Sequence, residues 1–329
     1  MKRITIYDVA KEANVSLATV SRVINGSDVV REDTRQKVQE AIENLGYKPN
    51  AIAQGLALQK TTSIAIVIPE ASFFYTGQII NGLIDVAKIY KYSIVLHTTT
   101  EGITKIDDVI ENIIKSRVDG VLIFNDKFTN DELDKLSKYQ IPTVVIGNKT
   151  TDSKIGSVFV NYEMLAYDLV TSYLNKGKNK VALIEDRKNP AMVRQLFDGA
   201  VKAYEEKGLI FKDYIEIPKT YKTSYSYLKE YFKVNKPDVL IAYRDTQAIA
   251  VLNSSEEQGY KIPDDMELVC ILDNKYTEMA RPRISGYKIP DYDLGAVAMR
   301  VLTKMLNTQE EFDKDIELNY SFVKRDTTK

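Results

Sequence analysis

The 329-residue sequence contains one cysteine, one histidine and no tryptophan. The single Cys270 excludes an internal disulfide, as is typical of a protein from a reducing compartment. It lies in the apolar run LVCIL, which predicts a buried and unreactive thiol. The sequence also lacks a signal peptide and any apolar run long enough to cross a membrane, so we expect a cytoplasmic protein without membrane contact.

The motifs of common enzyme classes are missing as well. His97 is the only histidine and stands at the end of a predicted strand, so no Ser-His-Asp or Cys-His arrangement can be built around it. There is no Gly-rich phosphate loop, and no cluster of His and Cys has metal-ligand spacing. We expect neither an enzyme nor a bound cofactor or metal; an enzyme that uses carboxylates alone is the alternative.

The sequence also lacks an excess of charge of either sign. The formal net charge is −1, and 44% apolar with 28% charged residues predict a globular protein. Residues 1–60 hold nine Lys and Arg against seven Asp and Glu, while the remainder holds 36 against 39. This difference in charge is too small to indicate a nucleic-acid partner. Evidence for DNA binding therefore has to come from sequence motifs.

Residues 3–25, RITIYDVAKEANVSLATVSRVIN, have the pattern of a helix-turn-helix. Thr5 and Asp8 have capping-box spacing and predict a helix start at Thr5. Asn14 tolerates the left-handed backbone of a tight turn, and Ser16 is a favourable N-cap for a second helix.

The second helix separates two kinds of side chain. Val20, Val23 and Ile24 share an inward face. Ala18, Ser21 and Arg22 point outward, and Leu17 lies beside them; small side chains, a hydroxyl and one arginine suit a DNA major groove. Arginine can bind guanine O6 and N7 together, and small apolar groups can meet a thymine methyl. The alternative is a helical hairpin with a solvated face.

A third helix and a linker follow. Residues 32–45 place Val38, Ile42 and Leu45 on one stripe, and Gly46 is the predicted stop. Pro49 interrupts the helical pattern, and residues 50–58 can form a helix of about two turns, which is too short to be stable alone.

The segments TIYDVAKEANVSLATVSRVING and LGYKPNAIAQGLA resemble the lac repressor family of bacterial transcription regulators without gaps. The resemblance implies a dimer on double-stranded operator DNA, with base contacts from Leu17, Ala18 and Arg22. It implies a phosphate-binding or supporting role for Thr5, Tyr7, Ser16, Thr19, Ser21, Asn25, Thr34, Tyr47 and Asn50. Leu56, beside the small Ala53, matches a residue that wedges into the minor groove in this family; an ordinary core leucine is the alternative.

Residues 61–329 alternate apolar strands with helices, which predicts parallel sheets covered by helices on both faces. The pattern occurs twice, with crossovers near 160 and 290. It resembles the two-lobed, periplasmic-binding-protein-like core of the same family. We therefore expect an α/β protein with a helical DNA-binding domain at 1–48, a hinge linker at 49–60 and a two-lobed regulatory and dimerisation core at 61–329.

Two segments, IYKYSIVL (89–96) and YDLGAVAMRVLTKMLN (292–307), resemble the branch of this family that serves carbon catabolite control in low-GC Gram-positive bacteria. The partner in that branch is the phosphocarrier HPr, phosphorylated on a serine. The resemblance places its contacts at Tyr292, Asp293, Arg300 and Lys304. Arg and Lys one helical turn apart can hold a phosphate; a solvated charged face is the alternative.

The cleft between the lobes departs from the family pattern. Leu196 and Ala200 replace the usual arginine and aromatic residue, and the motif before helix 245–258 reads Arg244-Asp245. A family-type site for a neutral sugar is therefore doubtful. The candidate effector residues in the cleft are Tyr75, Arg194, Arg244, Asp245 and Asp273. Arg244 in a cleft requires an acid or an anion: either Asp245 or Asp273 pairs with it, or it binds a ligand such as a sugar phosphate.

Three functions fit these observations to different degrees. The first is a dimeric regulator whose operator affinity rises when serine-phosphorylated HPr docks. The second is a regulator of one sugar operon that a small effector in the cleft controls. The third, a solute-binding protein, is disfavoured by residues 1–60.

Overall fold

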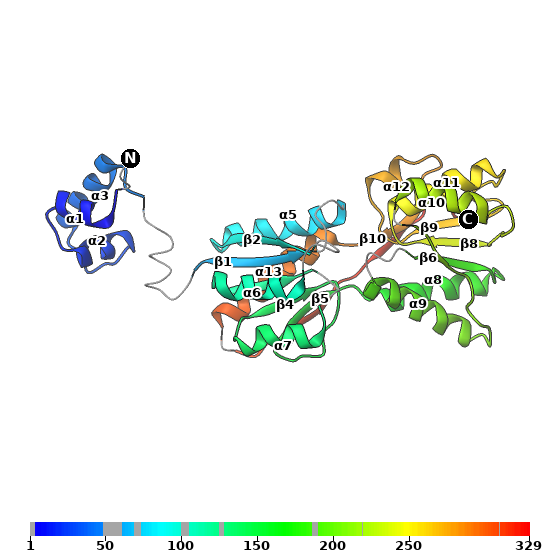
Figure 1. The fold of residues 1–329 in the computed structure, drawn as a ribbon, viewed down its shortest axis with the longest axis horizontal. Coiled ribbons are helices and arrows are strands. Elements are labelled where there is room, and N and C mark those ends of the chain that lie inside the picture. Colours follow the sequence, from blue (N-terminus) through cyan, green and yellow to red (C-terminus); the bar gives the residue numbers. More distant parts are fainter. Residues whose placement is uncertain are drawn as a thin grey trace. The chain divides into compact units, whose positions relative to one another are not determined.

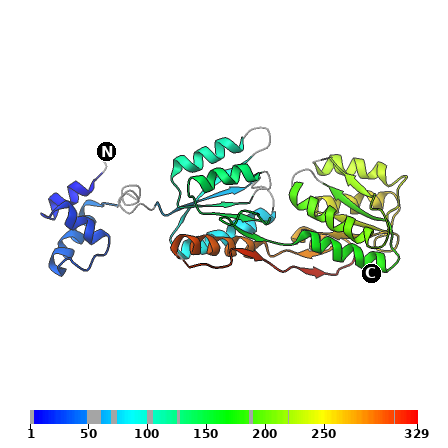
Figure 2. The same cartoon turned by 90° about the horizontal axis from the view of Figure 1, so that it is seen from below.

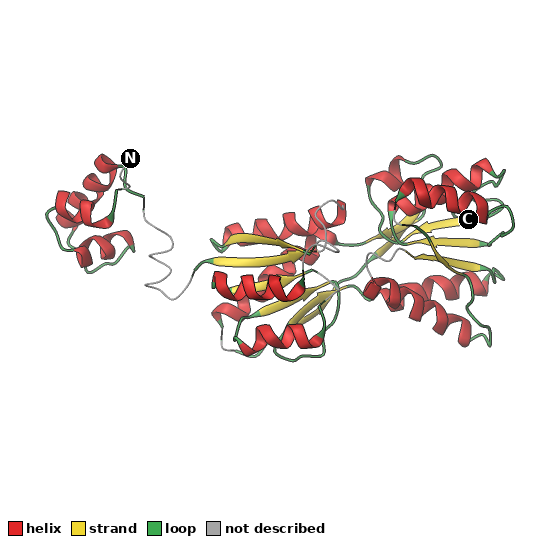
Figure 3. Ribbon diagram, in the orientation of Figure 1, coloured by secondary structure: helices red, strands yellow, loops and turns green. Residues whose placement is uncertain are grey.

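The structure is a computed structural model that describes residues 4–48, 61–68, 74–99, 105–124, 128–185, 190–218, 220–308 and 310–329. The chain divides into two compact units, Met1–Thr62 and Ser63–Lys329. Figure 1 traces the chain and Figure 3 marks its helices and strands. In the described ranges no helix is both apolar enough and long enough to cross a membrane.

The N-terminal unit is built from α1 (Ile6–Glu12), α2 (Leu17–Ile24) and α3 (Glu32–Leu45). Val9, Val20 and Val38, one from each helix, are fully buried in its small core. Gly46 ends α3 with a φ of 60°, which confirms the predicted stop. The helix boundaries agree with those expected from capping and periodicity.

The first lobe of the second unit is a parallel sheet in the order β11-β5-β4-β3-β1-β2. Its strands are β1 (Ser63–Ile68), β2 (Ser93–Thr98), β3 (Gly120–Ile123), β4 (Thr143–Ile146), β5 (Gly156–Phe159) and β11 (Asp315–Glu317). Its helices are α5 (Phe74–Ile89), α6 (Ile106–Ser116), α7 (Asn130–Lys138) and α13 (Asp291–Asn307). α5 and α13 cover one face, and α6 and α7 cover the other.

The second lobe repeats this plan with the order β12-β10-β9-β8-β6-β7. Its strands are β6 (Val181–Glu185), β7 (Tyr214–Glu216), β8 (Val239–Ala242), β9 (Glu267–Cys270), β10 (Ser285–Lys288) and β12 (Ser321–Val323). Its helices are α8 (Tyr162–Asn175), α9 (Pro190–Glu205), α10 (Tyr221–Tyr231), α11 (Asp245–Glu257) and α12 (Lys275–Met279). The α/β class is confirmed, with one difference: β12 at the sheet edge runs antiparallel to β10.

Alternate residues of the central strands pack on opposite helix layers. In β1, Ile64 and Ile66 face α5 and α13, whereas Ala65 and Val67 face α6 and α7. All four are fully buried, because a parallel sheet covered on both faces leaves no solvent side. This explains why the strands read as continuous apolar runs in the sequence.

The chain passes between the lobes at three places. It enters the second lobe between β5 and α8, returns between β10 and α13, and crosses again between β11 and β12. In Figure 2 the red segment near the C-terminus, which contains β11 and β12, runs from the first lobe to the second. The sequence predicted the first two crossings but not the third.

α5 and α13 approach so closely that glycine is required at the contact. A Cβ atom on Gly295 would lie 1.9 Å from the carbonyl oxygen of Ile79, and one on Gly82 would lie 1.9 Å from that of Tyr292. Such a distance forces backbone atoms apart, so the two helices are held in one register.

We expect Gly295→Ala to lower the free energy of unfolding by about 1–3 kcal/mol, because an added methyl overpacks this contact. Urea unfolding, followed by circular dichroism, measures the loss. Gly77→Ala is the matched control, since a Cβ there meets nothing within 4 Å. Equal stabilities of the two variants would contradict the close helix approach.

Candidate nucleic-acid interface and regulatory surfaces

The two helices of the helix-turn-helix begin as the sequence predicts. The Thr5 amide and hydroxyl donate to the Asp8 carboxylate at 2.8 and 2.7 Å. Asn14 has a φ of 51°, and the Ser16 hydroxyl accepts from the Thr19 amide at 3.1 Å. These bonds satisfy amides that a helix start leaves without partners, so they fix where α2 begins.

α2 presents the expected outward face. Leu17 is 38% exposed, and Ala18 and Arg22 are exposed beside it, while Val20 and Val23 are buried. Within residues 4–48 the Arg22 guanidinium makes no ion pair. Thr19 and Ser21 are half-buried at the edge of this face. An uncommitted guanidinium among small side chains can enter a groove and read a base edge.

The other residues implicated at the interface fall into three groups. Tyr7 and Asn25 are exposed, and the Asn25 amide donates to the Ser21 hydroxyl at 3.5 Å. Thr34 and Tyr47 are half-buried, with Tyr47 packed against the small core, which favours a supporting role for its ring. The predicted hinge helix and its residues Asn50, Ala53 and Leu56 lie outside the described residues.

α13 carries the predicted partner residues on one exposed stripe. Tyr292, Asp293, Arg300 and Lys304 are exposed, whereas the residues between them are mainly buried against the sheet. The Tyr292 hydroxyl donates to Asp85 of α5 at 3.2 Å, and this bond raises the pKa of the phenol. The Lys304 ammonium lies 4.2 Å from the ring centroid of Phe312. The structure thus leaves Asp293, Arg300 and Lys304 exposed on the same helix.

In the cleft, Asp245 and Asp273 pair with residues other than Arg244. The Asp273 carboxylate accepts from both terminal nitrogens of Arg325, at 2.6 and 2.8 Å. Asp245 accepts from the Asn274 amide at 2.8 Å. Arg244 is buried before α11, with its guanidinium carbon 5.8 Å from the Tyr243 ring centroid. Arg325 is a site residue that the sequence analysis missed, since 52 positions separate it from Asp273.

The remaining cleft candidates are not brought together with these residues. Arg194 is 80% exposed on α9, and its guanidinium lies 3.8 Å from the Asp198 carboxylate one turn along the helix. Tyr75 belongs to α5, and its side chain lies outside the described part of the structure. Leu196 and Ala200 are buried in the core, so the usual polar and aromatic cleft groups are replaced by packing.

Cys270 is fully buried in β9, and burial raises the pKa of its thiol, which confirms the predicted unreactive cysteine. Burial also lowers the pKa of His97 on β2. The described ranges contain no group of three or more His, Cys, Asp or Glu side chains that could hold a metal ion.

A helix-turn-helix with an exposed arginine on its second helix, in one chain with a two-lobed α/β core, is the arrangement of a DNA-binding regulator. Comparisons with known proteins agree. Residues 5–50 match the model of bacterial regulatory proteins of the lacI family, and residues 170–328 match the periplasmic binding protein-like domain.

Two curated relatives align over nearly the whole chain. The HTH-type transcriptional regulator pepR1 of Lactobacillus delbrueckii subsp. lactis is 35% identical over 99% of this chain and 98% of its own length. Catabolite control protein A of Priestia megaterium is 33% identical over 99% of each chain. The chain therefore belongs to the lacI family of DNA-binding transcription regulators.

Solved structures share the fold. The lac repressor dimer bound to operator and an anti-inducer superposes with a TM-score of 0.86 at 21% identity, over 99% of both chains. The regulator CcpA of Lactococcus lactis superposes with a TM-score of 0.71 at 24% identity, over 81% of this chain and 99% of that one.

Proposed function

We propose that this chain is a dimeric regulator of carbon catabolite control whose operator affinity rises when serine-phosphorylated HPr binds the exposed stripe of α13. The observation that carries the proposal is this stripe, with Arg300 and Lys304 one turn apart on it. The relatedness to catabolite control protein A at 33% identity supports it.

The chemistry of the stripe suits a phosphorylated protein. Arg300 offers a bidentate fork and Lys304 a second cation, which together match a phosphate of charge near −2. Tyr292 and Asp293 at the other end of the stripe add a hydroxyl and a carboxylate for polar contacts. Phe312 under the Lys304 ammonium limits its conformations, so less entropy is lost when an anion binds.

An apolar edge of the first lobe supports the proposed dimer. β2 is an edge strand of its sheet, yet Val95 and Leu96 on it are exposed. Ile89 and Tyr90 just before it are exposed as well. An edge strand with apolar side chains is usually protected or paired, and a second copy related by a two-fold axis would cover it.

The two-fold pair explains how the body controls DNA binding. Each copy would place one α2 on a half-site of a pseudo-palindromic operator. Partner binding on α13 is transmitted to α5, because the glycine contact holds these helices in register. A lobe shift that brings the two hinge segments together would let their short helices form, which adds contacts that otherwise cost too much entropy.

Arg300→Ala is expected to abolish the response to serine-phosphorylated HPr and to leave operator binding by the protein alone unchanged. The reason is that Arg300 is exposed on the core unit, and its proposed role is to bind the phosphate. Fluorescence anisotropy of labelled operator, titrated with and without the phosphorylated partner, measures both affinities.

Lys115→Ala, which removes an exposed helical cation of the same lobe, is the matched control and should keep the full response. A full response in Arg300→Ala would refute the partner site. Phosphorylated HPr without effect on the wild-type protein would refute the proposed regulation.

A repressor of a single sugar operon is the second candidate. The buried Arg244 favours it, because a cation at the start of α11 suits an anionic effector such as a sugar phosphate. The same operator titration with glucose 6-phosphate in place of the protein partner separates the candidates. A strong response to the sugar phosphate alone would favour the single-operon repressor.

A further inference from the structure

The buried core of Ser63–Lys329 continues from one lobe into the other through one layer of side chains. The cluster that contains Phe124 of the first lobe also contains Met192 and Tyr243 of the second. The two other clusters of this unit each stay within one lobe. The lobes are therefore joined by packing as well as by the three crossings of the chain.

Met192, in the first turn of α9, contacts the first lobe at Gly147. A Cβ atom on Gly147 would lie 3.3 Å from the Phe124 ring and 3.9 Å from the Met192 sulfur. Because glycine has no side chain, Phe124 and Met192 both pack directly over its backbone. Both side chains are buried there, one from each lobe.

Tyr243, which directly follows β8 in the second lobe, fixes the position of the Met192 side chain. Its hydroxyl donates to the Met192 sulfur at 3.3 Å. Its ring packs edge-on against Tyr162 of α8, with ring centroids 6.4 Å apart and an interplanar angle of 74°. Both tyrosines are buried. The flexible thioether is thus ordered within its own lobe, so contact with the first lobe costs little further entropy.

Gln195, about one turn further along α9, adds a polar contact to the same segment of the first lobe. Its side-chain amide donates to the side-chain oxygen of Asn148 at 2.9 Å. Both residues are half-buried. Asn148 directly follows Gly147, so the apolar contact and the hydrogen bond hold one short segment after β4.

These contacts lie at the carboxyl ends of parallel strands. Phe124 directly follows β3, Gly147 directly follows β4, and Tyr243 directly follows β8. Ligands of open α/β sheets bind at this edge, and two-lobed binding folds close around them there. In this chain the groups that bridge the lobes at that edge are its own side chains.

We propose that Met192 and Gln195 form a latch that keeps the two lobes closed without a small molecule. Separation of the lobes would expose Met192 and Phe124 to water and break the hydrogen bond to Asn148, and both changes oppose opening. A ligand shifts an equilibrium only toward a state that is not yet fully populated. A small effector that favours closed lobes would therefore change little in this chain.

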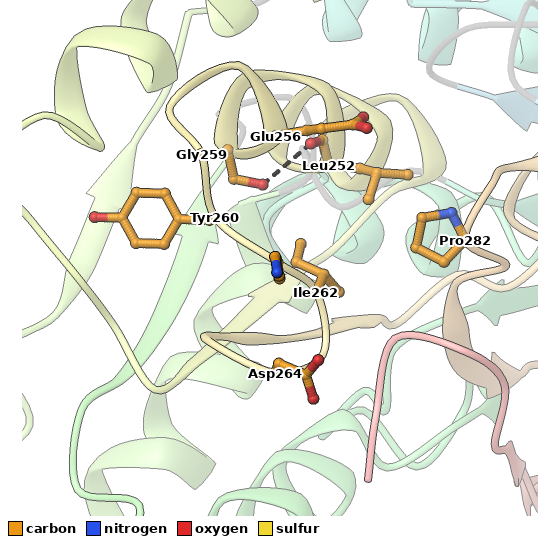
Figure 4. A pocket seen from close by; sticks show the side chains of 9 residues that line it. Leu252, Glu256, Gly259, Tyr260, Ile262, Asp264 and Pro282 are labelled. Atoms are coloured by element: carbon orange, nitrogen blue, oxygen red, sulfur yellow. Dashed lines mark hydrogen bonds between the residues drawn. The ribbon is translucent and has the colours of Figure 1, made fainter.

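Leu252 offers a matched control for the latch. It is buried like Met192, but it belongs to a cluster confined to the second lobe. It lines a cavity of about 450 Å³ beside the C-terminal end of α11 (Figure 4). Leu252→Ala and Met192→Ala each truncate a buried apolar side chain of the second lobe. Met192→Ala in addition removes a contact with the first lobe.

The test is the distance between spin labels on the two lobes, measured on the full chain by double electron–electron resonance. Asp131→Cys on α7 and Asp198→Cys on α9 supply exposed label sites, and the native Cys270 is fully buried and stays unlabelled. Labelled chain is mixed with an excess of unlabelled chain, so that each distance arises within one chain. Neither DNA nor HPr is needed, so the result is independent of the proposed function.

Without the further substitutions, the labelled chain is expected to give a single distance. Met192→Ala and Gln195→Ala should each add a second, longer distance. Leu252→Ala should keep the single distance, as should Met192→Leu, which conserves the volume and the apolar contacts of the side chain. Gln195 is half-buried, so its variant tests the latch even if Met192→Ala folds poorly. Several distances in the chain with the intact latch, or one unchanged distance in Met192→Ala and Gln195→Ala, would overturn the proposal.

Discussion

Arg325→Met is expected to lower the free energy of unfolding of the core unit by about 3–5 kcal/mol. Asp273 is 6% exposed and Arg325 12%, and two hydrogen bonds of 2.6 and 2.8 Å join them. Arg325 also donates to the Ile284 carbonyl at 2.7 Å. Its removal would leave a buried carboxylate to which, among the described residues, the hydroxyl of Thr277 is the remaining side-chain donor.

Urea unfolding of the full chain measures this loss, and two further variants identify its cause. Arg283→Met breaks a similar bidentate pair with Asp326, but those side chains are 53% and 42% exposed, so it should cost less than about 1 kcal/mol. Asp273→Asn combined with Arg325→Met should recover most of the stability, because no charge stays buried. Equal losses for Arg325→Met and Arg283→Met would show that burial of the pair is unimportant.

Arg22→Ala is expected to weaken operator binding by about 1–3 kcal/mol and to relax sequence preference at one base pair. The guanidinium is exposed on α2 and uncommitted within residues 4–48, so its loss removes a bidentate base contact without disturbing the small core. Selection of binding sites from a random library measures both effects.

Lys37→Ala is the control for Arg22→Ala, because Lys37 is exposed on α3 and is not among the residues implicated at the interface. It should leave both affinity and sequence preference close to those of the wild type. Unchanged discrimination at all positions in Arg22→Ala would exclude a role in base readout.

Local signals allowed the sequence to predict the helix-turn-helix and most of the core. Thr5, Ser16 and Gly46 act on backbone groups within a few residues, so their effect is readable from spacing alone. The central strands were predictable because burial on both faces produces uninterrupted apolar runs. α8 was missed, although Leu165, Leu169 and Tyr173 on it have helical spacing and are buried.

What the sequence could not reveal depends on distant partners. β10, β11 and β12 are three or four residues long and hold their places through neighbouring strands, so the third crossing had no local signal. The pairing of Asp273 with Arg325 joins residues far apart in the chain, so the sequence could suggest only Arg244 as its partner in the cleft. The glycine contact between α5 and α13 is likewise a tertiary requirement.

The most direct test of the central claim is a binding-site selection with the purified full chain, run with and without serine-phosphorylated HPr. We expect enrichment of one pseudo-palindromic sequence and tighter binding to it when the phosphorylated partner is present. Equal recovery of random DNA and every promoter fragment, under all ligand conditions, would contradict it.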